Sequence, residues 1–450
     1  MINIPRVTFL PRIFITVLHS ASARYIILRS SITTDRYTMQ SNILHYYRVN
    51  KTFMSQIGTW PDQNKTTRIL IPIVLMTISL TCLMAEVIIR SRLFVTLRML
   101  DTWGDADIIV ECIISSIIVV VCFTKLLNLS FRINQMRHLL SLIEYHWQVF
   151  NNSTDVEILQ DYVIFYRKVV IFYAIYIYSS TVLYLLIPMS PQILDIVMPL
   201  NESRPRKFLL EVEYHIDPEK YYYFILCHTC MSIISLMIMV VCADTTYILY
   251  VQHGCSLFAA IGYRLEHIVS EYQTSSSMEN EKTCRDKIVK DMYFKQTTFH
   301  ELVICLRKHQ LAIQYARYLE SSFTLSTGIQ LACNMLALSL TGIQVMSNLD
   351  NTDDLIRYAC LCGGSFFHLL CMSLPGQRLM DHSVNVFDKA CKSYWYTLSL
   401  EGKGLLRILL YRSIVPCTLT AGKIYVMSMA NYSTVVQTAM SYFMTFYSMK

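Results

Sequence analysis

The amino-acid sequence predicts an all-α membrane protein that crosses the bilayer seven times and extends helices into the cytoplasm. Composition is the first observation, since 54% of the 450 residues are hydrophobic and only 16% are charged. The mean hydropathy of +0.38 is correspondingly high. The second observation is a series of apolar stretches of about twenty residues, enough to span a hydrocarbon core of roughly 30 Å. The third is an uneven distribution of Lys and Arg between the connecting segments.

Seven apolar stretches have the length of a membrane span. Helix-breaking residues lie within or beside three of them, at Pro72, at Pro188 and at Gly363 with Gly364, so these boundaries are the least sharply defined. The predicted spans are residues 69–89, 108–129, 169–189, 222–243, 323–346, 355–374 and 424–447.

Positive charges predict the orientation of the chain. Segments on one side, from Arg36 to Arg68 and after the second, fourth and sixth spans, carry 25 Lys and Arg, whereas the other side carries 8. Because Lys and Arg concentrate on the cytoplasmic side, the N-terminus is predicted to be cytoplasmic and the C-terminus extracellular. Asn201, in the sequon Asn-Glu-Ser, then falls in an external loop where it can be glycosylated. This orientation is the reverse of that of G-protein-coupled receptors.

Several other classes of protein are disfavoured. The net charge of +7 follows from the cytoplasmic loops. The lipid bilayer is therefore the predicted partner, and nucleic acid is not. The stretch Cys227-His-Thr-Cys230 lies in an apolar run without the pattern of a redox site, and no cofactor or metal is predicted. A secondary transporter would show an internal repeat between its two halves, and this sequence shows none. Four ionisable residues in or beside the spans fall on different spans and sides, which argues against an enzyme. They are Glu86, Lys125, Asp244 and His368.

Four segments in order along the chain resemble a known family. They are YYRVNKTFMSQIGTWPDQ before the first span, CADTTYILYVQHGCSLFAAIGYRLE after the fourth, PGQRLMDHSVNVFDKACKSYWY after the sixth, and STVVQTAMSYF near the end. With the predicted topology, they resemble the insect odorant receptors, particularly the ant and bee expansions, over roughly residues 39–450. Gustatory receptors share the architecture, but the SYF ending and the Gly-Gln segment favour the odorant branch.

The resemblance implies a function and a set of partners. It implies a subunit of a tetrameric, odorant-gated, non-selective cation channel in the plasma membrane of olfactory sensory neurons. One tuning receptor would assemble with a co-receptor subunit into a heterotetramer and bind small volatile ligands. No enzymatic activity is implied. A gustatory-receptor-like channel subunit and a secondary transporter are the alternatives.

The resemblance also divides the chain into parts. We expect residues 1–38 to be a disordered extension or an artefact of the gene model, and residues 39–68 to be a cytoplasmic segment. Residues 69–375 would hold the first six spans, the ligand pocket and a long cytoplasmic loop at 251–320. In that loop, stretches rich in charged and helix-favouring residues predict helices at 262–271 and 282–318, with a break at 274–280. Residues 376–450 would hold a cytoplasmic anchor and the pore-lining last span.

The last span carries a row of hydroxyl groups. They recur at steps of four, three, four and three residues, which places them on one helical face. Such a row suits either water or close helix packing, and the resemblance favours pore lining, with Thr445 and Met449 near the constriction. Met440, Phe443 and Tyr447 would then face the helix bundle. The predicted pore-lining residues are Thr434, Thr438, Ser441, Thr445, Ser448 and Met449.

A pocket for volatile ligands needs apolar walls with a few polar groups. Such side chains lie in the outer halves of the third and fourth spans, and the resemblance adds three in the second and sixth. Ordinary packing between helices is the alternative for each, although an imidazole at membrane depth, that of His228, needs a partner or water. The candidates are Tyr176, Ser180, Tyr184, Tyr223, Phe224, His228 and Met231, with Ser116, Tyr358 and Cys362 added by the resemblance.

In the resembled family, the loop helices and the segment after the sixth span form an anchor that holds subunits together. Ordinary helix packing by the matching residues is compatible with that role. They are Gly376, Gln377, Ser383, Tyr394 and Trp395.

Overall fold

The computed structural model of the protein describes residues 47–97, 105–189, 191, 220–269, 284–347, 349 and 352–449. Contacts divide the chain into two units, Met1–Val49 and Asn50–Lys450, and the helices described here lie in the second except for residues 48 and 49. The predicted extension at 1–38, the sequon at Asn201 and the break at 274–280 lie outside the described residues.

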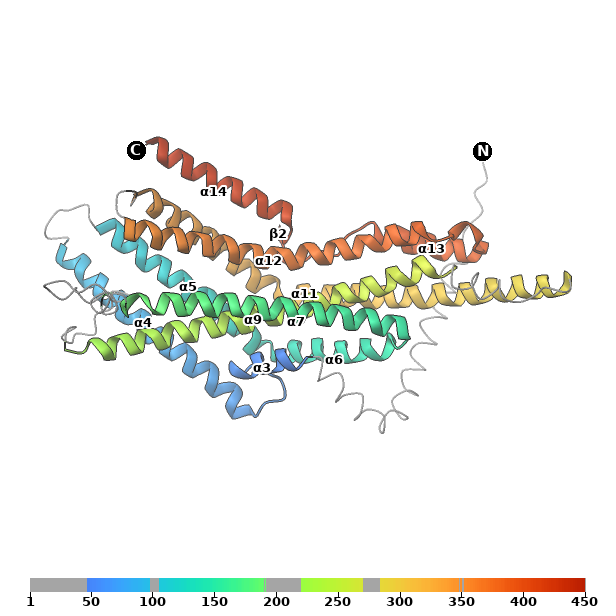
Figure 1. The fold of residues 1–450 in the computed structure, drawn as a ribbon, viewed down its shortest axis with the longest axis horizontal. Helices are drawn as coiled ribbons and strands as arrows, with labels where there is room; N and C mark the ends of the chain where they lie inside the picture. The colour runs from blue at the N-terminus through green and yellow to red at the C-terminus, as the bar shows by residue number, and fades with distance from the viewer. Residues whose placement is uncertain are drawn as a thin grey trace, which may run out of the picture. The chain divides into compact units, whose positions relative to one another are not determined.

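Seven long helices correspond to the predicted spans, so the all-α prediction is confirmed (Figure 1). Within the described residues, six helices are long and apolar enough to cross a membrane. The last helix has 21 residues, which reach about 31 Å at 1.5 Å per residue. The helices are α4 (Lys65–Leu97), α5 (Asp105–Phe131), α7 (Ser153–Leu185), α9 (Tyr222–His267), α11 (Cys284–Ser347), α12 (Thr352–Lys392) and α14 (Met429–Met449).

The helices continue beyond the spans on the predicted cytoplasmic side. Two of them, α9 and α11, take up most of the described part of segment 251–320. The first predicted helix there ends at His267 rather than at residue 271, and the second is helical from Cys284, where the described residues resume. The segment around Gly376 and Gln377 is also helical, because α12 runs through Pro375 without ending. Shorter elements complete the chain, and α6 and α13 among them were not predicted. They are α3 (Arg48–Gln56), α6 (Ile133–Val149), η1 (Ile187–Met189), η2 (Trp395–Thr397) and α13 (Leu400–Ser413).

The core is centred on α9. This helix packs against α4, α5, α7, α11 and α12, and Figure 1 shows it running alongside α7. From Val241 to Leu265 most of its residues are buried, including Tyr250, Cys255 and Phe258. A helix that is apolar on all sides is stable only when neighbours cover every face, so α9 forms the axis of the bundle.

A small hairpin precedes the last helix. Strands β1 (Thr420–Ala421) and β2 (Tyr425–Val426) pair antiparallel. Their turn is closed by a 3.2 Å hydrogen bond from the Ile424 N–H to the Ala421 carbonyl. Gly422 and Lys423 have φ of 62° and 61°, as a type I′ turn requires. The predicted start of the last span at residue 424 was therefore wrong, because a chain in this turn cannot also be helical, and α14 begins at Met429.

Candidate functional site

The hydroxyl row of α14 is exposed along its whole length. All five hydroxyl residues of the row are exposed in the single chain. Each hydroxyl donates to a backbone carbonyl in the preceding turn, at 2.8 to 3.1 Å. Because the hydrogens are used inside the helix, the oxygen lone pairs are left to face outward. The residues are Thr434, Thr438, Ser441, Thr445 and Ser448.

The opposite side of α14 does not pack into the bundle as expected. Met440 is 49% exposed, so its predicted position facing the bundle was wrong. Burial on α14 is confined to its first half, where Val435 is 9% exposed, and every described side chain after Ala439 is exposed. The physical reason is that α14 packs against α11 and α12, and no described side chain in its second half is covered by them. The side chains of Phe443, Tyr447 and Met449 lie outside the described set.

The five predicted anchor residues fall into two groups. Gly376, Gln377 and Ser383 lie on α12 and contact the segment that leads into α14. The Ser383 hydroxyl, for example, accepts a 2.9 Å hydrogen bond from the Cys417 N–H. Tyr394 and Trp395 lie at η2 and are 45% and 47% exposed, which leaves their rings available to another chain.

The predicted ligand residues are spread over different environments. Tyr358 and Cys362 on α12 are buried, at 5% and 8% exposure. Ser116, Tyr184 and His228 are half-buried. The remaining five are exposed on the outside of the single chain, and they are Tyr176, Ser180, Tyr223, Phe224 and Met231.

Two of these residues have partners that the sequence did not reveal. The Tyr176 ring on α7 lies 4.6 Å from the ring of Phe367 on α12. His228 Nε2 lies 3.1 Å from the Thr81 hydroxyl, which joins α9 to α4. The partner that an imidazole needs at membrane depth is therefore a hydroxyl on the neighbouring helix.

A buried polar network joins four helices. Lys125 Nζ on α5 lies 2.5 Å from Asp244 Oδ1 on α9 and 2.8 Å from His368 Nε2 on α12. The Tyr173 hydroxyl on α7 donates a 2.7 Å hydrogen bond to Asp244 Oδ2. The expectation that these ionisable residues are scattered was wrong for Lys125, Asp244 and His368. Because α5, α7 and α12 each pack against α9, distant sequence positions come to the same depth, which a linear pattern cannot reveal. The side chain of Glu86 is not among those described.

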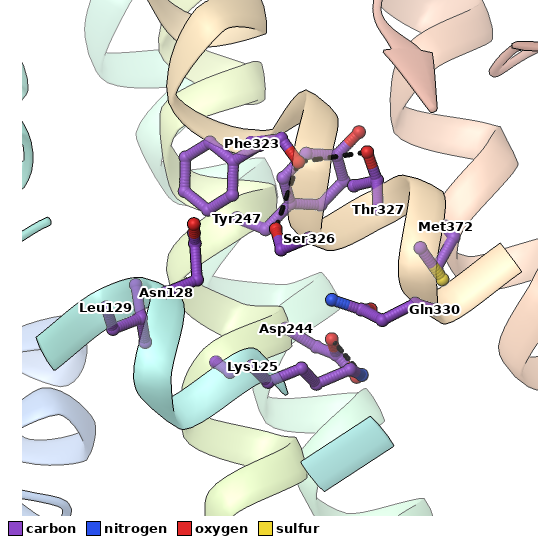
Figure 2. A pocket seen from close by; sticks show the side chains of 11 residues that line it. Lys125, Asn128, Leu129, Asp244, Tyr247, Phe323, Ser326, Thr327, Gln330 and Met372 are labelled. Carbon is purple, nitrogen blue, oxygen red and sulfur yellow. Dashed lines mark hydrogen bonds and ion pairs between the residues drawn. The ribbon is translucent and has the colours of Figure 1, made fainter. Parts of the chain in front are cut away.

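A small cavity lies beside this network (Figure 2). It has a volume of about 20 Å³, which suits roughly one water molecule. Ligand pockets for organic molecules usually need about 300 Å³ or more, so this cavity is too small for a volatile ligand. The Tyr247 hydroxyl lines it and has no hydrogen-bond partner among the described atoms. None of the ten predicted ligand residues lines this cavity.

The predicted cytoplasmic side has its own buried polar contacts. His146 Nδ1 on α6 and His253 Nε2 on α9 lie 3.1 Å apart, so one imidazole donates and the other accepts. The Tyr315 ring on α11 packs edge-on against both imidazoles. Burial lowers the pKa of His146 to about 4, which keeps it neutral. Nearby, Asp155 Oδ2 lies 2.5 Å from Lys308 Nζ, a second buried ion pair.

Fold and site together define a multi-pass helical membrane protein with an exposed, hydroxyl-lined terminal helix. The 7tm Odorant receptor family matches residues 108–440, more than half of the chain. The chain belongs to this odorant receptor family, which confirms the resemblance seen in the sequence.

Individual relatives and solved structures agree with this assignment. Odorant receptor 82a of Drosophila melanogaster is 26% identical over 133 residues, 30% of this chain and 34% of the relative. Odorant receptor 9a of the same species is 23% identical over 214 residues, 48% of each chain. The matches thus span about a third and a half of these relatives. The structure of the olfactory receptor OR5 from Machilis hrabei in complex with eugenol has a TM-score of 0.63 and 10% identity, covering 92% of this chain and 100% of that one. At that identity the likeness concerns the fold.

Proposed function

We propose that this chain is the tuning subunit of an odorant-gated, non-selective cation channel. In this proposal it assembles with a co-receptor subunit into a heterotetramer in the plasma membrane of olfactory sensory neurons. Volatile odorants are its ligands, in keeping with the family and with the eugenol named for the Machilis receptor of the same fold.

One observation carries the proposal. α14 exposes its hydroxyl row and, in its second half, its other described side chains, so within the described single chain the second half of this helix is left uncovered. A helix of this composition has little to gain from lipid on its polar face. Copies of α14 from several subunits could face one another around a water-filled path. Outward hydroxyl lone pairs without a fixed charge would attract cations weakly, which suits low selectivity.

The ligand pocket is proposed in the outer halves of α5, α7, α9 and α12. Aromatic and sulfur-containing side chains there, such as Tyr358 and Cys362, supply the apolar walls that a volatile molecule needs. His228, paired with Thr81, is the proposed polar anchor. The small cavity at Lys125 is excluded as the odorant site by its volume of about 20 Å³.

Current recorded from voltage-clamped cells tests the proposal. Cells that express this chain with an insect odorant co-receptor should show inward cation current when a panel of volatiles is applied. Cells with the co-receptor alone are the control and should not respond to the same volatiles. If the pair reaches the cell surface and no volatile in a broad panel evokes current beyond that control, the proposal is wrong.

A further inference from the structure

The start of α14 is held against α12 by a close backbone contact. A Cβ atom on Gly376 would overlap the carbonyl oxygen of Met427 and would lie 2.8 Å from the Cβ of Met427. Real Cβ atoms do not approach other heavy atoms that closely, and backbone atoms cannot move aside as a flexible side chain can. Only glycine at position 376 therefore lets α12 and the segment before α14 approach to this distance.

Gln377, the next residue on α12, caps α14. Its Oε1 accepts a 3.0 Å hydrogen bond from the N–H of Met429, the first residue of α14. The first four N–H groups of a helix have no acceptor inside the helix and need one elsewhere. Ser428, at the N-cap position, accepts from the Asn431 N–H at 3.2 Å. The start of α14 is thus capped partly by its own chain segment and partly by a side chain of α12.

Asp381 lies one turn further along α12 and orients the Gln377 amide. Its Oδ1 accepts a 2.7 Å hydrogen bond from Gln377 Nε2. A carboxylate can only accept, so the amide nitrogen must point to Asp381 and the amide oxygen must point to Met429. The two contacts form a chain of hydrogen bonds from Asp381 through Gln377 to the α14 backbone.

The β1–β2 hairpin holds the same region to α11. The Gly422 N–H donates a 2.7 Å hydrogen bond to the Thr324 carbonyl. Gly328 also allows close approach here, since a Cβ on it would lie 2.8 Å from the Gly422 nitrogen. The base of α14 is therefore fixed to two helices, while its second half is exposed.

We infer that Gln377 and Asp381 are positioning residues that set the direction of α14 relative to α12. α12 is one continuous helix that also carries Tyr358 and Cys362 near its other end, so a movement of its outer part reaches Gln377 without passing a loop. The hydrogen bonds from Gln377 transmit that movement to α14. This inference rests on the proposed function, because it makes α14 the element that opens the pore.

The test exchanges the two polar groups while it keeps both hydrogen bonds. Gln377→Glu loses the donor to Asp381 and places two carboxylates one turn apart, and their repulsion should move the new side chain away from the Met429 N–H. Asp381→Asn alone retains an acceptor for Gln377 and should have a small effect. In the double variant the new amide at position 381 can donate to the new carboxylate at position 377, which still accepts from Met429. Gln314→Glu adds the same charge at an exposed site on α11 and is the control.

Hydrogen exchange of the purified full-length protein measures the cap without any channel activity. We expect peptides that contain Met429 to exchange about threefold faster or more in Gln377→Glu and to return to the wild-type rate in the double variant. Unchanged exchange in Gln377→Glu, or a loss of protection that Asp381→Asn does not reverse, contradicts the inference. This result stands even if the wild-type chain carries no current with any partner, which would refute the proposed function alone.

Currents recorded with the co-receptor then measure the coupling. In Gln377→Glu we expect the ratio of current at saturating odorant to current without odorant to change about threefold or more, following the same loss of a hydrogen bond. The odorant concentration for half-maximal response relative to each variant's own maximum should stay near that of the wild type. The double variant should restore the ratio, and Gln314→Glu should not change it. Wild-type ratios in every variant would contradict the role in coupling even if the exchange rates respond.

Discussion

Lys125 Nζ on α5 lies 2.5 Å from Asp244 Oδ1 on α9, in the interior of the helix bundle. Only 2% of the lysine side chain and 13% of the aspartate side chain are exposed. Removing two charges from water is costly, and their mutual attraction offsets this cost only with good geometry and further hydrogen bonds. His368 and Tyr173 supply those hydrogen bonds.

Lys125→Met should therefore destabilise the protein strongly. The change leaves the Asp244 carboxylate buried without its cation, and losing one partner of a buried pair typically costs about 3 to 5 kcal/mol. Thermal unfolding of the purified protein in detergent measures the effect. Lys168→Met, at an exposed site on α7, is the matched control. The double variant Lys125→Met with Asp244→Leu should recover much of the stability. A double variant as unstable as Lys125→Met would show that the buried charge is not the cause.

Acidification should destabilise the protein through His146. Its pKa is near 4 in the folded protein and 6.5 in a free chain, so the unfolded state binds more protons between these values. The neutral imidazole makes its full contribution to the free energy of unfolding above pH 6.5. This contribution, about 3 kcal/mol in total, is lost as the pH falls toward 4. His146→Asn should reduce the slope of stability against pH in this window, whereas His300→Asn, at an exposed site, should leave it unchanged. Equal slopes for wild type and His146→Asn would contradict the assignment.

Substitutions near the end of α14 should change permeation. Thr445 and Met449 are the predicted constriction, so Thr445→Leu should lower single-channel conductance by replacing a hydroxyl with an apolar group, and Met449→Ala should raise it by widening the path. Both are recorded with the co-receptor at saturating odorant. Ion preference is compared in the same recordings, and the half-maximal odorant concentration should not move. A loss of surface expression without a change in conductance would favour helix packing over pore lining.

The orientation predicted from charge can be tested with epitope tags. A tag after Lys450 should be stained on intact cells, and a tag near Gln40 should be stained only after permeabilisation, because the side with 25 Lys and Arg is predicted to be cytoplasmic. The opposite staining pattern would overturn the orientation. A co-expressed cytoplasmic marker controls for the integrity of the cells.

The sequence by itself determined the class of protein, the helices and the hydroxyl row. A segment in lipid must satisfy its backbone hydrogen bonds internally, so an apolar run of sufficient length has little choice but to be a helix. Helical spacing likewise placed Thr434 to Ser448 on one face, and the structure confirms that this face is exposed.

Only the tertiary structure decided which helices meet and at what depth. Lys125, Asp244 and His368 come together because α5, α9 and α12 pack side by side, and periodicity along one helix carries no information on its neighbours. The same limit hid the contact between Gln377 and Met429, which are separated by α13 and a hairpin. For the same reason the prediction that Met440 faces the bundle was wrong, because its exposure depends on how much of α14 the rest of the chain covers. Local pattern determines a helix and its faces, whereas the partner of each face is set by the packing of the whole chain.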